Sequence, residues 1–241
     1  MMTPLQKLTI YLGTDSKEPL SLRELLVGQI PDTSNDDFEV TIIVAPSIAV
    51  TIHDDLASPA MQSIRHAIEF VVHRYGSLTY WCHAHNLASS VTHKEIIFRL
   101  IGRNARAHAW VAWQGSGNKK CVIKTIQDHQ AEHSQSRIEV RGVLDDTAVL
   151  SCTSLIKVAP HAFDVVADQL NKNLMLSSTA HALAAPQLEV ENNDVQCRHG
   201  AAISTLSEDQ LFYLEGRGLS LEHARRMLIQ SFLNAHSERN I

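Results

Sequence analysis

Short runs in which apolar and polar residues alternate recur from Phe38 to about Ile203. The runs are FEVTIIV (38–44), SLTYWCH (77–83), EIIFRLI (95–101), RIEVRGVL (137–144) and QLEVEN (187–192). Alternation with period two, and clustering of β-branched residues, are typical of β-strands. The pattern therefore predicts a mainly β domain over residues 38–203.

Small and polar corners separate these runs, among them RNARAHA (103–109), LDDTAV (144–149) and APHAFD (159–164). Many short strands with such corners suit a sandwich, a barrel or a parallel β-solenoid. Asn-Gly and Asp-Gly hairpin turns are nearly absent, which weighs against the antiparallel options. A parallel β-solenoid is therefore favoured, although no fixed repeat period can be read from the sequence.

One stretch gives a conflicting pattern. In PAMQSIRHAIEFVVHRYG (59–76), Met61, Ile64, Ile68 and Val71 follow helical spacing, so pattern alone predicts a helix over 60–73. The run IEFVV in its second half is rich in β-branched and aromatic residues. We expect a strand in that second half.

The pattern changes after Ile203. Ser207 followed by Gln210 is a capping box, and EDQLFYLEG (208–216) then runs for about two turns before Gly216 and Gly218. Ser220 is a second N-cap candidate, followed by an apolar stripe at helical spacing: Leu221, Ala224, Leu228, Phe232 and Ala235. The chain is divided accordingly into a lead-in (1–37), a β-solenoid core (38–203) and a C-terminal helical subdomain (204–241).

Composition and charge limit the classes of function. The chain has 241 residues, 44% of them hydrophobic, and a formal net charge of −5, which provides no basic surface for nucleic acid. No apolar run approaches the roughly 20 residues that cross a bilayer, and no secretory signal opens the chain, so we expect a cytoplasmic protein without membrane contact. Nucleotide-binding and hydrolase signatures are missing, which argues against an autonomous enzyme.

Cys197 and His199 in NDVQCRHGAA (193–202) are the main candidates for a metal site. In an extended segment they point to one face, with their Cα atoms about 7 Å apart, close enough to share one iron or zinc ion. Two ligands cannot complete a tetrahedral site, so others would come from elsewhere in the chain, a partner or solvent. The alternative is a buried structural cysteine beside a hydrogen-bonded histidine.

The other histidine clusters are weaker candidates. CHAH (82–85) places Cys82 on one strand face and His83 and His85 on the other, and DHQAEH (128–133) fits neither a zinc-protease nor a zinc-finger spacing. For both, polar corners and solvated strand faces are the better interpretation. The four cysteines lack a C-x-x-C pair, so neither a disulfide framework nor a closed zinc site is indicated.

The terminal helices allow two interpretations. Their apolar stripe can pack against the end of the β-domain, the commoner use of a terminal amphipathic helix. Alternatively it can dock a partner, with Phe212, Tyr213 and Arg217 as the aromatic and arginine anchors that interfaces favour.

The segment from Asn171 to Leu233 resembles the C-terminal half of SufD proteins, in the SufB/SufD family of iron–sulfur cluster assembly proteins. The similarity rests on the order NKNLMLS, PQLEV, NDVQCRHGA, LSEDQLFYLEGRG and ARRMLIQSF, and extends more weakly upstream to about Phe38. Arg198 and Ala202 stand where the family usually has serine and threonine. SufD proteins also have a longer N-terminal helical region, so the resemblance is to a short form.

This resemblance implies a right-handed parallel β-helix followed by a helical subdomain. It also implies pairing with a SufB-like paralogue or a second copy of the chain, and docking of a SufC-like ATPase that itself hydrolyses ATP. Cys197 and His199 then fall at the subunit interface as iron or cluster residues, with a transient iron ion or cluster and no stably bound cofactor. The ATPase contact falls on Leu211, Phe212, Tyr213, Leu214, Arg217, Gly218, Ala224, Arg225 and Leu228. The alternative is a purely structural β-helix partner, in which Cys197 and His199 only shape the interface.

Overall fold

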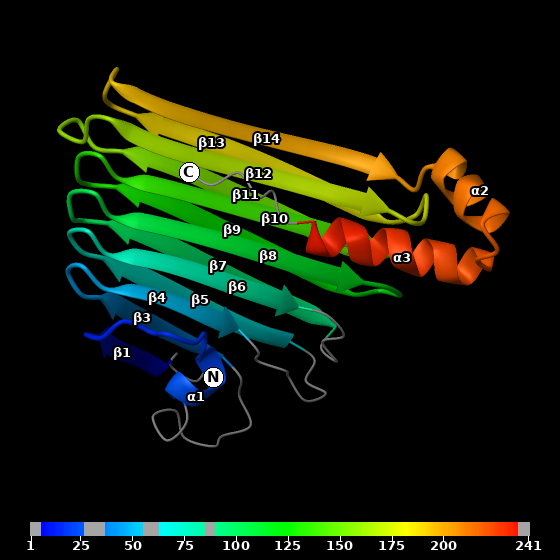
Figure 1. Ribbon diagram of the computed structural model, residues 1–241, viewed down its shortest axis with the longest axis horizontal. Coiled ribbons are helices and arrows are strands. Elements are labelled where there is room, and N and C mark those ends of the chain that lie inside the picture. The colour runs from blue at the N-terminus through cyan, green and yellow to red at the C-terminus, as the bar shows by residue number, and fades with distance from the viewer. Residues whose placement is uncertain (1–5, 27–36, 55–62, 85–89, 236–241) are drawn as a thin grey trace.

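Two parallel β-sheets form the body of the protein in the computed structural model, which describes residues 6–26, 37–54, 63–84 and 90–235. Odd-numbered strands form one sheet, here the odd sheet: β1 (Gln6–Leu12), β3 (Phe38–Val44), β5 (Ser63–Val72), β7 (Val91–Leu100), β9 (Lys120–His129), β11 (Val149–Val158) and β13 (His181–Val190). The even sheet contains β2 (Leu20–Ser21), β4 (Ala49–Asp54), β6 (Ser77–Ala84), β8 (Arg106–Gly115), β10 (Gln135–Leu144), β12 (Val165–Met175) and β14 (Val195–Thr205). Successive coils stack along one axis (Figure 1), so the predicted parallel β-solenoid is confirmed.

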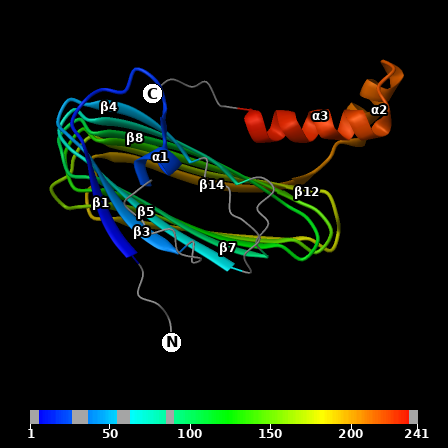
Figure 2. The same ribbon diagram turned by 90° about the horizontal axis from the view of Figure 1, so that it is seen from below.

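Alternation along each strand explains the two-sheet body. In β11, Leu150, Cys152, Ser154, Ile156 and Val158 are all buried, whereas the residues between them are more exposed. Because successive side chains of a strand point to opposite faces, one row of each strand fills the space between the sheets. Seen along the stack, the two sheets enclose this single interior (Figure 2).

The helical spacing noted over residues 60–73 does not produce a helix where the structure describes that stretch. β5 spans Ser63–Val72 and pairs in parallel with β3 and β7. Ile64, Ile68, Phe70 and Val72 are all buried, as the even positions of a strand. The expected strand is therefore confirmed for the second half and begins earlier, because pairing on both sides outweighs local periodicity.

One corner of the solenoid repeats the same backbone device in successive coils. Five residues there have positive φ angles near 60°, a conformation that is uncommon outside glycine: Ser47, Tyr75, Asn104, His133 and Asp164. Each donates its backbone N–H to a carbonyl of the following coil, at 2.7 to 3.2 Å. At the same corner Gly102 leaves no room for a side chain, because a Cβ there would lie 1.9 Å from the backbone nitrogen of Arg74.

The N-terminal end of the solenoid is covered. β1 pairs in register with β3, and α1 (Leu22–Leu26) lies between the two sheets at that end (Figure 2). Leu22 and Leu26 of α1 are buried in the same core as the strands. These elements lie within residues 1–37, the predicted lead-in. Its described part therefore contributes two strands to the sheets and a short helix that covers the end of the core.

A buried ion pair lies within the early coils. The carboxylate of Asp54 accepts hydrogen bonds from the ammonium of Lys94 and, at 2.6 Å, from the hydroxyl of Tyr80. Burial alone would raise the pKa of Asp54, but the charge and hydrogen bond of Lys94 outweigh it and lower that pKa. The pKa of Lys94 is raised, because Asp54 outweighs the opposing effect of burial.

Polar side chains fill much of the interior in the later coils. Gln127 donates to Gln169 at 3.0 Å and accepts from Ser136 at 2.6 Å. His129 is held between the hydroxyls of Ser134 and Ser136, each at 2.7 Å, and burial lowers its pKa to about 3. The imidazole is therefore neutral, and because the Ser136 hydroxyl donates to Gln127, the hydrogen bond between His129 and Ser136 is donated by Nε2–H of His129.

Two helices follow the last strand. α2 (Glu208–Gly216) begins at Ser207, whose side chain accepts from the backbone of Gln210, and α3 (Leu221–Asn234) begins at Ser220 in the same way. Both predicted N-caps are thus confirmed. Within the described residues, no helix is long and apolar enough to cross a membrane.

α3 lies against the outer face of the even sheet (Figures 1 and 2). Leu233 is buried there with Trp110 and Val143, and Arg141 donates to the carbonyl of Phe232. α2, by contrast, buries none of its residues. The packing interpretation therefore holds for α3, whereas α2 projects outward from the body of the protein.

Candidate functional site

Cys197 and His199 lie on β14, the edge strand of the even sheet in the last coil (Figure 1). Among the described strands β14 pairs with β12 alone, where Ala167 stands opposite Cys197 and Gln169 opposite His199. Both partners are buried between the sheets. Register and alternation therefore place Cys197 and His199 together on the inward row, as the sequence predicted, at the open end of the interior.

The two side chains differ in exposure. Cys197 is half-buried and packs against the apolar cluster of Val165, Ala167 and their neighbours, whereas His199 is exposed. Burial, with a smaller effect of Asp168, raises the pKa of the Cys197 thiol. The thiol is therefore protonated at neutral pH in this chain alone, and a cation bound beside it would favour the thiolate.

Arg198 points to the opposite face of β14. It makes a two-pronged contact with the Asp168 carboxylate of β12, at 2.8 and 2.9 Å. This pair ties the edge strand to its neighbour beside Cys197. A slip of one residue would reverse every side chain of β14, so the register that brings Arg198 opposite Asp168 is also the one that turns Cys197 inward.

The last coil leaves apolar surface uncovered around these residues. Ile203, on the same row of β14 as Cys197 and His199, is 59% exposed, and Leu188 and Val190 are exposed on the inward row of β13. Both strands are sheet edges, so their outer backbone groups do not pair with another of the strands that the structure describes. An open edge with apolar side chains is a template for another chain.

The chain alone does not assemble a metal site within its described residues. No three His, Cys, Asp or Glu side chains there come close enough to hold one ion. A tetrahedral site built on Cys197 and His199 would thus need ligands from outside this part of the chain.

The weaker histidine candidates have structural roles where they are described. Cys82 is buried, and burial raises its pKa to about 12, which leaves an inert thiol. His83 is exposed on the other face, and His85 lies outside the described residues. In DHQAEH, His129 is the buried histidine described above, and His133 contacts Asp164 at 2.6 Å at the corner.

The residues predicted to contact an ATPase fall into three groups. Phe212, 79% exposed, and Tyr213, 59% exposed, project from α2, and Arg217 lies over the Tyr213 ring at 5.2 Å. Gly218 is also exposed, and closes α2 with a φ of 93°. The others are less accessible: Leu211, Leu214, Arg225 and Leu228 are half-buried and Ala224 is fully buried.

Gln169 is a residue near the site that sequence analysis did not single out. Its side chain lies under His199 in the stack and is fixed by Gln127 from the odd sheet. Nothing in the local sequence marks it, because its proximity to His199 depends on the register between two coils 30 residues apart.

Comparison with known proteins indicates the family to which the chain belongs. Residues 40–232 match the family model described as SUF system FeS cluster assembly, SufBD core domain. The chain is similar to the iron–sulfur cluster assembly protein SufD of Escherichia coli, 29% identical over 154 residues, which cover 64% of this chain and 36% of that protein.

Two further relatives match shorter stretches. A SufBD family protein of Synechocystis is 40% identical over 90 residues, covering 37% of this chain and 20% of its own. The chloroplastic protein ABCI7 of Arabidopsis thaliana is 48% identical over 77 residues, covering 32% and 16%. The matched stretches thus span well under half the length of these relatives. Because the family model covers most of its length, this chain belongs to the SufB/SufD family of iron–sulfur cluster assembly proteins.

Proposed function

We propose that this chain is a SufD-like scaffold subunit that handles iron or a nascent iron–sulfur cluster at an interface formed by its last coil. The observation that carries the proposal is the placement of Cys197 and His199 side by side on the inward row of an open edge strand. A second β-solenoid, from a SufB-like paralogue or another copy of this chain, would cover that edge and supply the missing ligands.

The two side chains suit such a transient site. A thiolate gives the stronger bond to iron, and a neutral imidazole gives a weaker, exchangeable one. Cys197 is half-buried, so its release of a proton would accompany metal binding, while the exposed His199 would remain accessible to the partner. The iron or cluster would be cargo that the complex passes on.

The apolar surface of the last coil supports pairing. Ile203, on the row of Cys197 and His199, and Leu188 and Val190, on the inward row of β13, are exposed side chains that a second chain would remove from water. Open strand edges on both sheets would allow main-chain hydrogen bonds to the partner as well.

α2 would dock the ATPase of the complex. Phe212, Tyr213 and Arg217 form an exposed aromatic and cationic group on a helix that buries none of its own residues. Aromatic and arginine residues dominate the binding energy of most interfaces. ATP hydrolysis would belong to that SufC-like partner.

The test of the metal role uses the complex reconstituted with a co-expressed SufB-like subunit. We expect Cys197→Ser and His199→Ala to assemble normally but to acquire less iron and sulfide than the parent. His181→Ala, at an exposed histidine of β13, is the matched control and should retain the parent's content. If both site variants assemble and load like the parent, the pair only shapes the interface.

Docking of the ATPase is tested separately. Tyr213→Ala should weaken binding of a SufC-like subunit by about 2 kcal/mol, as expected for a central aromatic anchor. Tyr11→Ala, at an exposed tyrosine of β1, is the control. Equal affinity of the two variants would remove α2 from the interface.

A further inference from the structure

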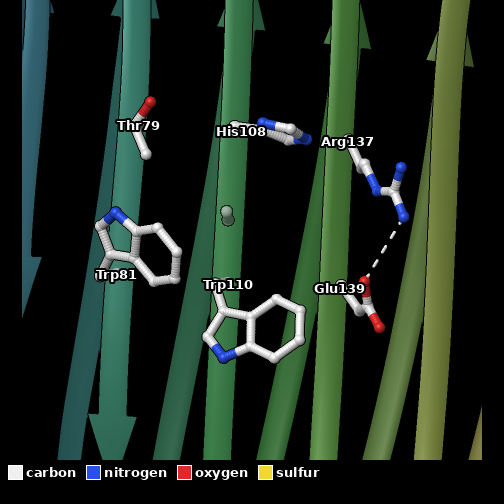
Figure 3. A pocket seen from close by; sticks show the side chains of 7 residues that line it. Thr79, Trp81, His108, Trp110, Arg137 and Glu139 are labelled. Carbon is white, nitrogen blue, oxygen red and sulfur yellow. Dashed lines mark hydrogen bonds and ion pairs between the residues drawn. The ribbon is translucent and has the colours of Figure 1, made fainter. Parts of the chain in front are cut away.

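A shallow slot lies on the outer face of the even sheet, beside the surface that α3 covers. It crosses β6, β8 and β10 and encloses about 70 Å³ (Figure 3). Its lining consists of Thr79, Trp81, His108, Ala109, Trp110, Arg137 and Glu139. None of these residues belongs to the last coil or to α2, so the slot is separate from the site proposed above.

Two tryptophans form the apolar wall. Trp81 and Trp110 are neighbours in the register of β6 and β8, with ring centroids 6.3 Å apart. On the far side of Trp110, Arg141 stacks over the indole at 4.7 Å and Phe232 of α3 lies beyond it. α3 thus accounts for the burial of Trp110 from one side, while Trp81 remains half-exposed beside the slot.

The other wall is polar and contains a basic group. Thr79, His108 and Arg137 follow one another across the three strands, as Figure 3 shows. The guanidinium of Arg137 lies 3.5 Å from the carboxylate of Glu139. Burial, followed by the charge of Arg137, lowers the pKa of His108, so this imidazole is a neutral hydrogen-bonding group at physiological pH.

Positive charge exceeds negative charge at the β10 end of the slot. Arg141 at 2.8 Å and Lys172 at 4.0 Å approach Glu139 together with Arg137, so three cations surround one carboxylate. The next carboxylate along the polar row, Asp168, is engaged by Arg198. An anion in the slot would therefore meet a favourable field in a partly desolvated place.

The size of the slot limits what enters it. A volume of about 70 Å³ is roughly half that of a cavity of roughly 150 Å³ that holds benzene, so the slot admits a group of a few heavy atoms, such as a carboxylate. Any larger body must then extend outward over the exposed part of Trp81, where a planar ring can stack. Arg137 offers the planar fork that recognises a carboxylate.

We propose that the slot binds a small organic acid, with its carboxylate beside Arg137 and a planar apolar body against Trp81 and Trp110. The chemistry that selects the ligand is the combination of both groups, because Arg137 alone would accept any anion. The proposal is independent of the iron site and of the docking partners.

Titration of the purified chain with benzoate, acetate and benzamide, followed by tryptophan fluorescence and ligand-observed NMR, tests it. We expect saturable benzoate binding with a dissociation constant of about 1 mM or less, and at least about tenfold weaker binding of acetate and benzamide. Arg137→Gln and Trp81→Leu should each weaken benzoate binding about tenfold or more.

Arg106→Gln, at an exposed arginine of β8 outside the slot, is the control and should bind like the parent. The unfolding midpoint of each variant verifies that it is folded, and NMR detects binding without relying on the tryptophan that is replaced. Equal binding of the three probes, absence of saturation, or undiminished binding by folded Arg137→Gln would each overturn the proposal.

Discussion

The two ends of the solenoid differ in whether the interior between the sheets is covered. At the N-terminal end α1 places Leu22 and Leu26 over a core of aliphatic and aromatic side chains. At the C-terminal end apolar side chains of β13 and β14 are exposed, over an interior that contains amides and hydroxyls. Both ends have edge strands, but in the described residues the apolar row over the interior is exposed at the C-terminal end, which indicates that this end is available for association.

The largest expected effect compares one apolar side chain from each end. Phe70 is fully buried against Tyr80 and Phe98, so Phe70→Ala should lower the free energy of unfolding by about 3–5 kcal/mol. Ile203→Ala, in the exposed last coil, should lower it by less than about 0.5 kcal/mol. Urea denaturation of the isolated chain measures both, and comparable losses would mean that the last coil is as well packed as the early ones.

The buried ion pair of the early coils and the exposed ion pair of the last coil should differ in their contribution to stability. Lys94→Met leaves the Asp54 carboxylate buried without its cation and should cost about 3–5 kcal/mol of unfolding free energy. Arg198→Met removes the exposed partner of Asp168 and should not shift the unfolding midpoint measurably.

A double variant checks the cause of the Lys94 effect. Asp54→Leu with Lys94→Met removes both charges and should recover much of the loss, because the isolated buried charge is the main cost. No recovery would assign the loss to packing of the lysine side chain.

The polar interior gives the protein an acid sensitivity. His129 has a pKa of about 3 when folded, against about 6.5 in an unfolded chain, so the unfolded state takes up the proton first. Its contribution is complete above pH 6.5 and is lost as the pH falls toward 3, on the order of a few kcal/mol. His129→Asn should flatten the pH dependence of the unfolding free energy in that window, relative to the exposed control His181→Asn. An unchanged slope would show that other groups control it.

The smallest expected effect separates the two terminal helices. Ser220→Ala removes the N-cap of α3, which packs on the even sheet, and should cost about 1 kcal/mol in unfolding free energy. Ser207→Ala removes the equivalent cap of α2, which has no fully buried residue, so it should fray that helix without shifting the global midpoint. Amide hydrogen exchange in α2 and denaturation of the whole chain distinguish these outcomes.

Local patterns in the sequence predicted much of this architecture. Alternation located strands such as β3 and β10, the capping residues Ser207 and Ser220 located both helices, and β14 carries Cys197 and His199 on the predicted common face. Each of these features depends on residues close together in the chain, where spacing and side-chain chemistry are sufficient.

Features that depend on stacking were not predictable in this way. Gln169 meets Gln127 only because the two sheets face each other, and Trp81 meets Trp110 only through strand register. The strand over Ser63–Val72 followed its neighbours β3 and β7 and not its own helical spacing. The fixed period was hidden too, because the left-handed corner is occupied by five dissimilar residues instead of a glycine.

Because that corner recurs once in each coil, we expect whole coils to be the segments that are gained or lost in evolution. Ser47, Tyr75, Asn104, His133 and Asp164 lie 28 to 31 residues apart, and each donates a backbone hydrogen bond to the coil that follows. A duplication or deletion of one such interval would place a donor opposite an equivalent carbonyl, whereas a change of a few residues within a strand would break the ladder on both sides. Inserted segments would therefore be tolerated better at the opposite turns, between an even strand and the odd strand that follows, and strands would be gained or lost in whole coils.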